Sequence, residues 1–220
     1  MRAWLALREG GVDFEERVVD IRKPQRFKNL ASIGEFSPSA AVPVLVADDT
    51  VIFDSLAIME YANDCCGGRL LPADRQTRAR ARAFLAWQHA GLSGLCARIS
   101  FESAFYPEKR PLTKTEIAEC DRLFNVWEKE LAASGGPYLF ESLSLADLAL
   151  VPTIIRLTAH KPDMSLQPRV KSWCDRLCSR ASVREWMEDA KKSPPVWLDD
   201  YQPLKEQRSR LPSGAPRGRA

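Results

Sequence analysis

Residues 41–61 read AVPVLVADDTVIFDSLAIMEY, and this stretch decides the fold of the N-terminal part of the chain. The apolar residues of 41–47 and of the shorter run 51–53 predict two strands, and Asp48 and Asp49 predict the turn between them. The second strand leads directly into residues 55–63, whose apolar spacing predicts a helix. The stretch therefore predicts a hairpin followed at once by a helix.

Pro43 lies inside the first predicted strand, where proline is unusual because it cannot donate a ladder hydrogen bond. A Val-Pro bond that leads into a strand is often cis, and it would turn the backbone N–H and C=O of Val42 outward. Such an exposed backbone edge can pair with an extended peptide. Taken alone, however, the pair Val42 and Pro43 is more typical of a simple edge strand.

Asp54 and Ser55 lie where the second strand meets the helix. A serine hydroxyl and the N–H groups at a helix start can together bind a carboxylate. Taken alone, Ser55 is more typical of a plain helix cap. Its spacing from Val42 and Pro43, however, makes a binding site the favoured interpretation over a plain cap and an edge strand. The site would take a short peptide with a free carboxylate.

The rest of the N-terminal part mixes helix and strand patterns. Residues 2–8 predict a helix that ends at Gly10 and Gly11. Residues 14–21 alternate apolar and charged side chains, which predicts a strand. Residues 38–40 predict a turn before the hairpin.

After Pro72 the patterns are helical throughout. Residues 75–102 carry one apolar stripe and predict a single long helix. The sequence TKTE at 113–116 matches a helix capping box, and residues 145–159 are apolar nearly all round, which predicts a helix surrounded by protein. Two shorter helices are expected around Trp173 and Trp186.

These patterns divide the chain into three parts. Residues 1–72 predict a small α/β domain, and residues 77–200 predict an all-helical domain, so the fold class is α+β. Residues 201–220 are rich in Pro, Gly, Ser and Arg and predict a disordered basic tail.

Composition excludes several classes of function. The net charge of the 220 residues is +3, and no basic face stands out, so we expect no nucleic-acid partner. The longest apolar run, at 145–155, is too short to span a membrane and contains Asp147. The first residues do not form a secretory signal, so we expect a cytoplasmic protein.

The six cysteines are expected to be thiols rather than disulfides or metal ligands. No pair has the Cys-x-x-Cys spacing of a zinc site or a redox dithiol. Buried thiols are the usual state in a reducing compartment. We therefore expect no metal site, including at Cys174 and Cys178, which share a helix face.

Together these features resemble the glutathione S-transferases, over nearly the whole chain up to about residue 200. The stretch at 41–61 is similar to the glutathione-binding half of their thioredoxin-like domain. SLSLADLALVPTI at 142–154 is similar to the capping motif of their helical domain. RAWLALREGGVDFEERVVD at 2–20 is similar to a bacterial subgroup in which Ser-Ser-Trp-Ser precedes the first helix.

The resemblance implies glutathione as a substrate and assigns roles to matching residues. Val42 would bind the cysteinyl part of glutathione through its backbone, and Pro43 would be the cis proline that permits this. Asp54 and Ser55 would hold the γ-glutamyl end. Family members commonly have a basic or polar residue before Val-Pro, where this chain has Ala40 and Ala41, and one ligand contact is then missing.

The resemblance also implies a first strand and a catalytic Ser, Cys or Tyr just before the first helix. The written sequence begins at that helix, so the catalytic residue is unknown and is expected upstream of Met1. The alternative is a shortened protein. The helix predicted at 75–102 would line the pocket for a small electrophile, with His89 and Arg98 as candidates. His89 is also compatible with a packed or surface histidine.

Three functions remain open from the sequence. The first is an enzyme that conjugates, isomerises or reduces small electrophiles with glutathione. The second is a non-catalytic binding protein that keeps the transferase fold. The third is a redox protein that uses Cys65 or Cys66, which are expected at the helix end away from the site. The resemblance also implies a homodimer.

Overall fold

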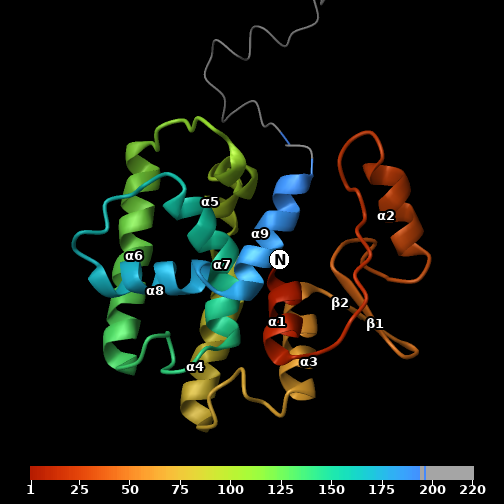
Figure 1. Cartoon of the computed structure of the whole chain (residues 1–220), viewed down its shortest axis with the longest axis horizontal. Helices are drawn as coiled ribbons and strands as arrows, with labels where there is room; N and C mark the ends of the chain where they lie inside the picture. Colours follow the sequence, from red (N-terminus) through yellow and green to blue (C-terminus); the bar gives the residue numbers. More distant parts are fainter. Residues whose placement is uncertain (194–195, 197–220) are drawn as a thin grey trace, which may run out of the picture.

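The structure is a computed structural model that describes residues 1–193 and residue 196. Its described elements form two groups: a small sheet with helices α1, α2 and α3, and then a set of helices without strands (Figure 1). This is the α+β arrangement expected from the sequence. The tail at 201–220, for which the sequence predicts disorder, lies outside the described residues.

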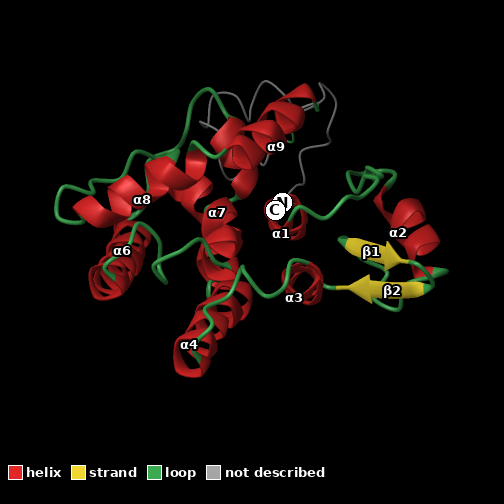
Figure 2. Ribbon diagram, turned by 60° about the horizontal axis from the view of Figure 1, so that its bottom comes forward, coloured by secondary structure: helices red, strands yellow, loops and turns green. Residues whose placement is uncertain are grey.

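Helix α1 (Arg2–Gly10) confirms the helix predicted at 2–8. It is capped by Gly11, whose φ of 69° is left-handed backbone that glycine adopts without strain. The buried face of α1 packs against α3 (Ser55–Cys65), which confirms the helix predicted at 55–63. Figure 2 shows the two helices nearly end-on and side by side.

Helices α1 and α3 run parallel. A Cβ added at Gly10, the last residue of α1, would lie 3.2 Å from the backbone oxygen of Ala62, which belongs to the last turn of α3. The C-terminal ends of the two helices therefore meet, and their N-terminal ends lie together at the opposite end.

The predicted hairpin is formed by β1 (Val44–Ala47) and β2 (Thr50–Phe53), which pair antiparallel. The first strand begins at Val44 rather than at residue 41, directly after the Val42–Pro43 peptide bond, which is cis as expected. Val44 pairs with Phe53. Residues 42–43 and 54–55 therefore leave the same end of the hairpin.

The strand predicted at 14–21 is wrong. In the described part of the chain the sheet has two strands, and residues 14–21 form neither a strand nor a helix. Alternation alone does not make a strand, because the backbone groups also need a neighbouring strand to pair with. Val18 is 87% exposed, so the alternation does not bury an apolar face either.

Helix α2 (Arg26–Gly34) lies beside the hairpin (Figure 2). The sequence patterns predicted no element between residues 21 and 38. Of its nine residues, Ile33 is the one that is buried, so the apolar stripe that would signal a packed helix is weak.

The single helix predicted at 75–102 is also wrong, because the segment is divided into four pieces. These are α4 (Arg75–Ala86), a π-helical turn η1 (Trp87–Gly91), α5 (Ser93–Arg98) and a 3₁₀ turn η2 (Phe101–Phe105). A Cβ at Gly91 would lie 2.4 Å from the Trp87 ring, so this turn requires glycine. The predicted apolar stripe nevertheless remains on the buried side.

The remaining helices are α6 (Lys114–Ser134), α7 (Leu145–Thr158), α8 (Pro168–Cys178) and α9 (Ala181–Lys192). Helix α7 is buried on nearly all sides and packs against α1, α4 and α8, which confirms the helix predicted at 145–159. No helix in the described residues combines the length and the apolar character needed to cross a membrane.

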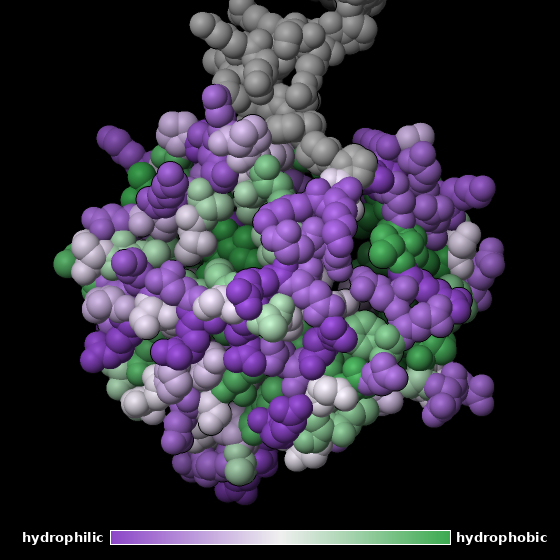
Figure 3. All heavy atoms as spheres, in the orientation of Figure 1, coloured by the Kyte–Doolittle hydropathy of each residue, from purple (hydrophilic) through white to green (hydrophobic). Residues whose placement is uncertain are grey.

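The surface seen in Figure 3 is largely hydrophilic, with apolar atoms visible between the polar side chains. The N-terminal part contributes several large exposed apolar side chains, which are Val18, Ile21, Phe27, Phe36, Val42, Val46 and Phe53. Val46 and Phe53 lie on the same face of the hairpin, because Phe53 pairs with Val44, two residues before Val46.

The capping box at the start of α7 is present as predicted, and it is completely buried. The Asp147 carboxylate accepts hydrogen bonds from the backbone N–H and the hydroxyl of Ser144 at 2.9 and 2.6 Å. It also accepts from the backbone N–H of Leu139 at 3.0 Å and from the indole N–H of Trp173 at 2.9 Å. One carboxylate thus joins the loop before α7 to helix α8.

Asp147→Ala should lower the free energy of unfolding by at least about 3 kcal/mol, because it leaves four donors without an acceptor inside the protein. Urea denaturation monitored by tryptophan fluorescence measures this. Asp163→Ala removes an exposed carboxylate that accepts a backbone N–H from Ser165 at 2.9 Å, and it is the matched control. Equal losses in the two variants would contradict the role given to Asp147.

The second predicted capping box, at Thr113 and Glu116, is also present. Glu116 is buried and accepts two hydrogen bonds from Arg110, at 2.7 and 2.9 Å, and one from the backbone N–H of Thr113 at 2.8 Å. The Arg110 guanidinium, assisted by Thr113 and opposed by burial, lowers the pKa of Glu116 from 4.5 to about 2.

The lowered pKa of Glu116 gives a stability contribution that is present above about pH 4.5 and lost as the pH falls toward about 2. Glu116→Gln should therefore be less stable than the wild type at pH 7, by about 1–3 kcal/mol. The difference should shrink across that window in urea titrations. Glu108→Gln, at an exposed position nearby, is the control. A pH-independent difference for Glu116→Gln would contradict this account.

Candidate functional site

The candidate site lies where the N-terminal ends of α1 and α3 come together. The first N–H groups of a helix have no partner within the helix, and they carry partial positive charge. Two such ends side by side form a place that favours an anion. Arg2, in the first turn of α1, adds a full positive charge at this end.

Asp54 and Ser55 form the α3 side of the site. The Asp54 carboxylate accepts the backbone N–H of Leu56 at 2.7 Å and so caps the helix, and its side chain is 46% exposed. Ser55 is buried, and its hydroxyl has no hydrogen-bond partner among the described residues. The hydroxyl of Ser55 is therefore available for a ligand at this helix end.

Val42 forms the hairpin side of the site. It is 41% exposed, and its backbone N–H and C=O form no hydrogen bond within the described part of the chain. The register of the hairpin brings it to the same end as Asp54. The structure thus brings together Val42, Pro43, Asp54 and Ser55, which the sequence proposed as one binding site.

Residues of the helical part complete the site. The Arg2 guanidinium donates to the side-chain oxygen of Gln88 at 2.5 Å and lies 3.4 Å from Nδ1 of His89. Nε2 of His89 lies 3.5 Å from a carboxylate oxygen of Asp54. Burial lowers the pKa of Arg2, and the nearby Asp54 carboxylate acts in the opposite direction.

Sequence reasoning missed Arg2 and Gln88. Arg2 has no pattern of its own, because its partners lie more than eighty residues away. Gln88 did carry a signal, since it is a polar residue on the apolar stripe of the predicted helix and is buried in the structure. A buried amide needs a partner, and here that partner is Arg2.

The two residues proposed for the second-substrate pocket are separated. His89 lies beside Asp54, as described above. Arg98 is exposed and forms an ion pair with Glu119 of α6. No contact joins Arg98 to Asp54, Ser55 or His89 in the described residues.

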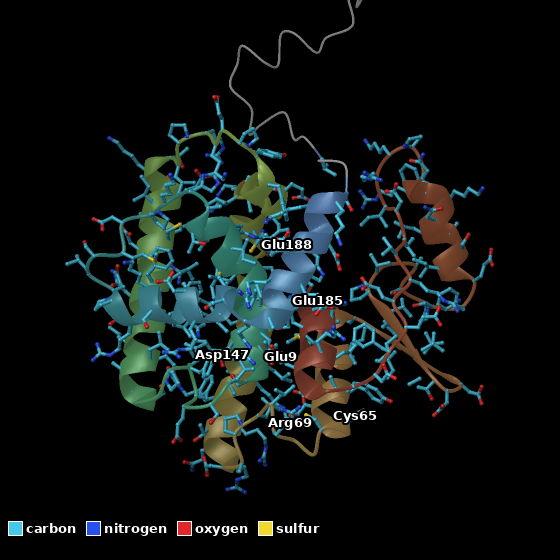
Figure 4. The ribbon with its side chains drawn as sticks, in the orientation of Figure 1. Glu9, Cys65, Arg69, Asp147, Glu185 and Glu188 are labelled. Carbon is cyan, nitrogen blue, oxygen red and sulfur yellow. The ribbon has the colours of Figure 1, made fainter. Side chains whose placement is uncertain are left out.

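The other end of α1 is fixed to the helical part. Glu9 accepts hydrogen bonds from Arg180 at 2.8 and 2.5 Å and from the hydroxyl of Ser182 at 2.5 Å. Arg8 pairs with Glu185 of α9, also at 2.5 Å. Figure 4 labels Glu9 of α1 and, beside that helix, Glu185 of α9. These contacts hold α1 in place while its N-terminal end faces the site.

Cys65 is exposed and is the last residue of α3 (Figure 4). Cys66 follows it directly. An eleven-residue helix is about 16 Å long, so Cys65 lies about that far from Asp54 at the other end of the helix. The redox function considered for Cys65 and Cys66 would therefore use a place remote from the candidate site.

A cavity of about 780 Å³ also lies away from the candidate site. It is bounded by the start of α4, the end of α6 and the loop that leads to α7. Three of its charged side chains have partners, since Arg80 pairs with Glu130 and Asp74 caps α4. None of the site residues named above lines this cavity.

Comparison with known proteins identifies the family. A model of the glutathione S-transferase N-terminal domain matches residues 1–65, and a model of the glutathione S-transferase C-terminal domain matches residues 103–189. The chain belongs to the glutathione S-transferase family. The expected fold class, a thioredoxin-like domain followed by an all-helical domain, is thereby confirmed, whereas the bacterial serine-type subgroup stays a prediction.

Individual relatives agree with this. Glutathione S-transferase 1 of Dianthus caryophyllus is 34% identical over 181 residues, which cover 79% of this chain and 80% of that protein. Disulfide-bond oxidoreductase YfcG of Escherichia coli K12 is 28% identical over 188 residues, covering 81% and 85%. A solved glutathione transferase homolog from Burkholderia gl BGR1 with bound glutathione is 26% identical, with a TM-score of 0.64, covering 87% and 91%.

The π turn η1 positions Gln88 and His89, and Gly91 is the residue that permits it. Gly91→Ala should displace the Trp87 ring, because the added Cβ would lie 2.4 Å from it. We expect a loss of about 1–3 kcal/mol in the free energy of unfolding. Gly94→Ala is the control, since its Cβ would approach Arg98 at an ordinary 3.7 Å. Equal thermal stability of the two variants would contradict the steric argument.

Proposed function

We propose that the protein binds glutathione between the Val42–Pro43 peptide and the start of α3 and uses its thiol on a small electrophile. The observation that carries the proposal is the convergence of three groups at one place. These are the unpaired backbone of Val42, the free hydroxyl of Ser55, and the adjoining N-terminal ends of α1 and α3. The bound glutathione of the Burkholderia homolog supports it.

Each of these groups is suited to bind one part of glutathione. The backbone of Val42 pairs with the backbone of the cysteinyl residue, as one strand pairs with another. The α-carboxylate of the γ-glutamyl residue is bound by the Ser55 hydroxyl and the first N–H groups of α3. Asp54, which is negatively charged and partly exposed, faces the α-amine of the same residue.

The chemistry proposed is thiolate attack. A free thiol has a pKa near ~8.5 and is largely protonated at neutral pH. Positive charge near the sulfur lowers that pKa and favours the thiolate. The N-terminal end of α1 and the Arg2 guanidinium supply positive charge on this side of the site. The thiolate sulfur then bonds to the electrophilic atom. In conjugation it adds to that atom or displaces a leaving group from it, in isomerisation glutathione leaves again, and in reduction a second glutathione takes up the bound sulfur as glutathione disulfide.

A non-catalytic binding protein with the same fold is the alternative considered from the sequence. The relatives named above, a transferase and a disulfide-bond oxidoreductase, favour the enzyme. We further propose a homodimer in the cytoplasm. The six free thiols support a reducing compartment such as the cytoplasm. The exposed apolar side chains of the hairpin, Val46 and Phe53, support an interface with a second copy of the chain. A single-chain mass in analytical ultracentrifugation would contradict the dimer.

The proposal is tested by isothermal titration calorimetry with glutathione. We expect the wild type to bind, and Ser55→Ala to bind about tenfold more weakly because one hydrogen bond to the carboxylate is lost. Ser179→Ala is the control, because Ser179 is exposed at the end of α8 and bonds its own helix. A wild-type protein that does not bind glutathione would overturn the proposed function.

A further inference from the structure

His89 is held between two charged groups from different parts of the fold. It belongs to the π turn η1 of the helical part, whereas Arg2 belongs to α1 and Asp54 caps α3. Its Nδ1 lies 3.4 Å from the Arg2 guanidinium, and its Nε2 lies 3.5 Å from a carboxylate oxygen of Asp54. The imidazole therefore bridges the two helix ends that form the glutathione site.

The partners of His89 determine where its proton is. A guanidinium has donors and no acceptor, so the ring nitrogen that faces Arg2 has to accept. Nδ1 is then unprotonated, and the proton of a neutral imidazole is on Nε2. That nitrogen lies 3.5 Å from a carboxylate oxygen of Asp54, which faces it as an acceptor. A doubly protonated ring would place an N–H against the Arg2 donors.

The Asp54 carboxylate is thereby held from two sides. One oxygen accepts the backbone N–H of Leu56 at 2.7 Å, and the other faces His89. Each carboxylate oxygen can accept two hydrogen bonds, so acceptor capacity remains on both. The side chain is 46% exposed, and a ligand ammonium can reach it.

We propose that His89 is a positioning residue for glutathione: as a neutral imidazole with its proton on Nε2, it fixes the Asp54 carboxylate to receive the α-amine of the γ-glutamyl residue. This inference rests on the proposed function. It assigns His89 to recognition of the γ-glutamyl end rather than to the electrophile. It also makes the helical part of the chain a contributor to the selectivity of the glutathione site.

The test compares two ligands that differ in the α-amine alone, namely glutathione and glutaryl-cysteinyl-glycine. Calorimetry gives the ratio of their dissociation constants for the wild type, His89→Leu and His89→Gln. The wild type should prefer glutathione by at least about tenfold, the value of one charge-assisted hydrogen bond. His89→Leu should lose most of this preference, with weaker binding of glutathione and little change for the analogue.

His89→Gln is the rescue variant. Its side-chain oxygen can accept from Arg2 while its NH₂ group donates to Asp54, so it can reproduce both contacts of the neutral imidazole. We expect it to keep most of the preference. The control is His160→Gln, because His160 packs against the Ser103 hydroxyl at 3.2 Å and takes no part in the site. His160→Gln should keep the wild-type preference.

The outcomes separate the inference from the proposed function. A wild type that binds neither ligand overturns both. A wild type that prefers glutathione, together with a His89→Leu variant that keeps the same ratio, overturns the role of His89 alone. Equal loss of affinity for both ligands in His89→Leu also overturns it, because that is the result of a general structural change. Failure of His89→Gln to restore the ratio contradicts the assigned tautomer.

Discussion

The close parallel packing of α1 on α3 is the constraint on which the site depends. At Gly10 the approach is limited by the backbone oxygen of Ala62, 3.2 Å from the position of a Cβ. A larger residue there would push the helices apart at one end and change the angle between them. The N-terminal ends at the other end of the pair would then move as well. Glu9 and Arg8, held by Arg180 and Glu185, keep α1 in this position against the helical part.

Local patterns predicted most of the elements of this fold. The hairpin, the start of α3 and both capping boxes depend on interactions within a few residues, so short stretches of sequence contain their signals. Residues 14–21 show the limit of this reasoning. Their alternation is that of a strand, but a strand also requires a neighbour, and alternation contains no information about one. The division of 75–102 likewise depends on how Gly91 packs beneath Trp87.

The residues of the candidate site likewise fall into those that the sequence could predict and those that it could not. Val42, Pro43, Asp54 and Ser55 come from one continuous stretch, and their common position follows from the pairing of Val44 with Phe53. The contacts of His89 could not be predicted, because its partners come from α1 and from the start of α3. The sequence placed it on a helix expected to line the pocket for an electrophile, and the structure shows which charged groups it faces.

The interactions that form the candidate site also join the N-terminal part of the fold to the helical part. Burial of Arg2 carries a desolvation cost, which its polar neighbours offset. Two of these neighbours, Gln88 and His89, belong to the helical part, whereas Asp54 belongs to the hairpin and α3. Asp54 therefore has two roles: it is expected to contact the bound ligand, and it lies beside His89 of the helical part. Ligand affinity and the stability of this contact are linked quantities, since anything that binds the assembled arrangement stabilises it.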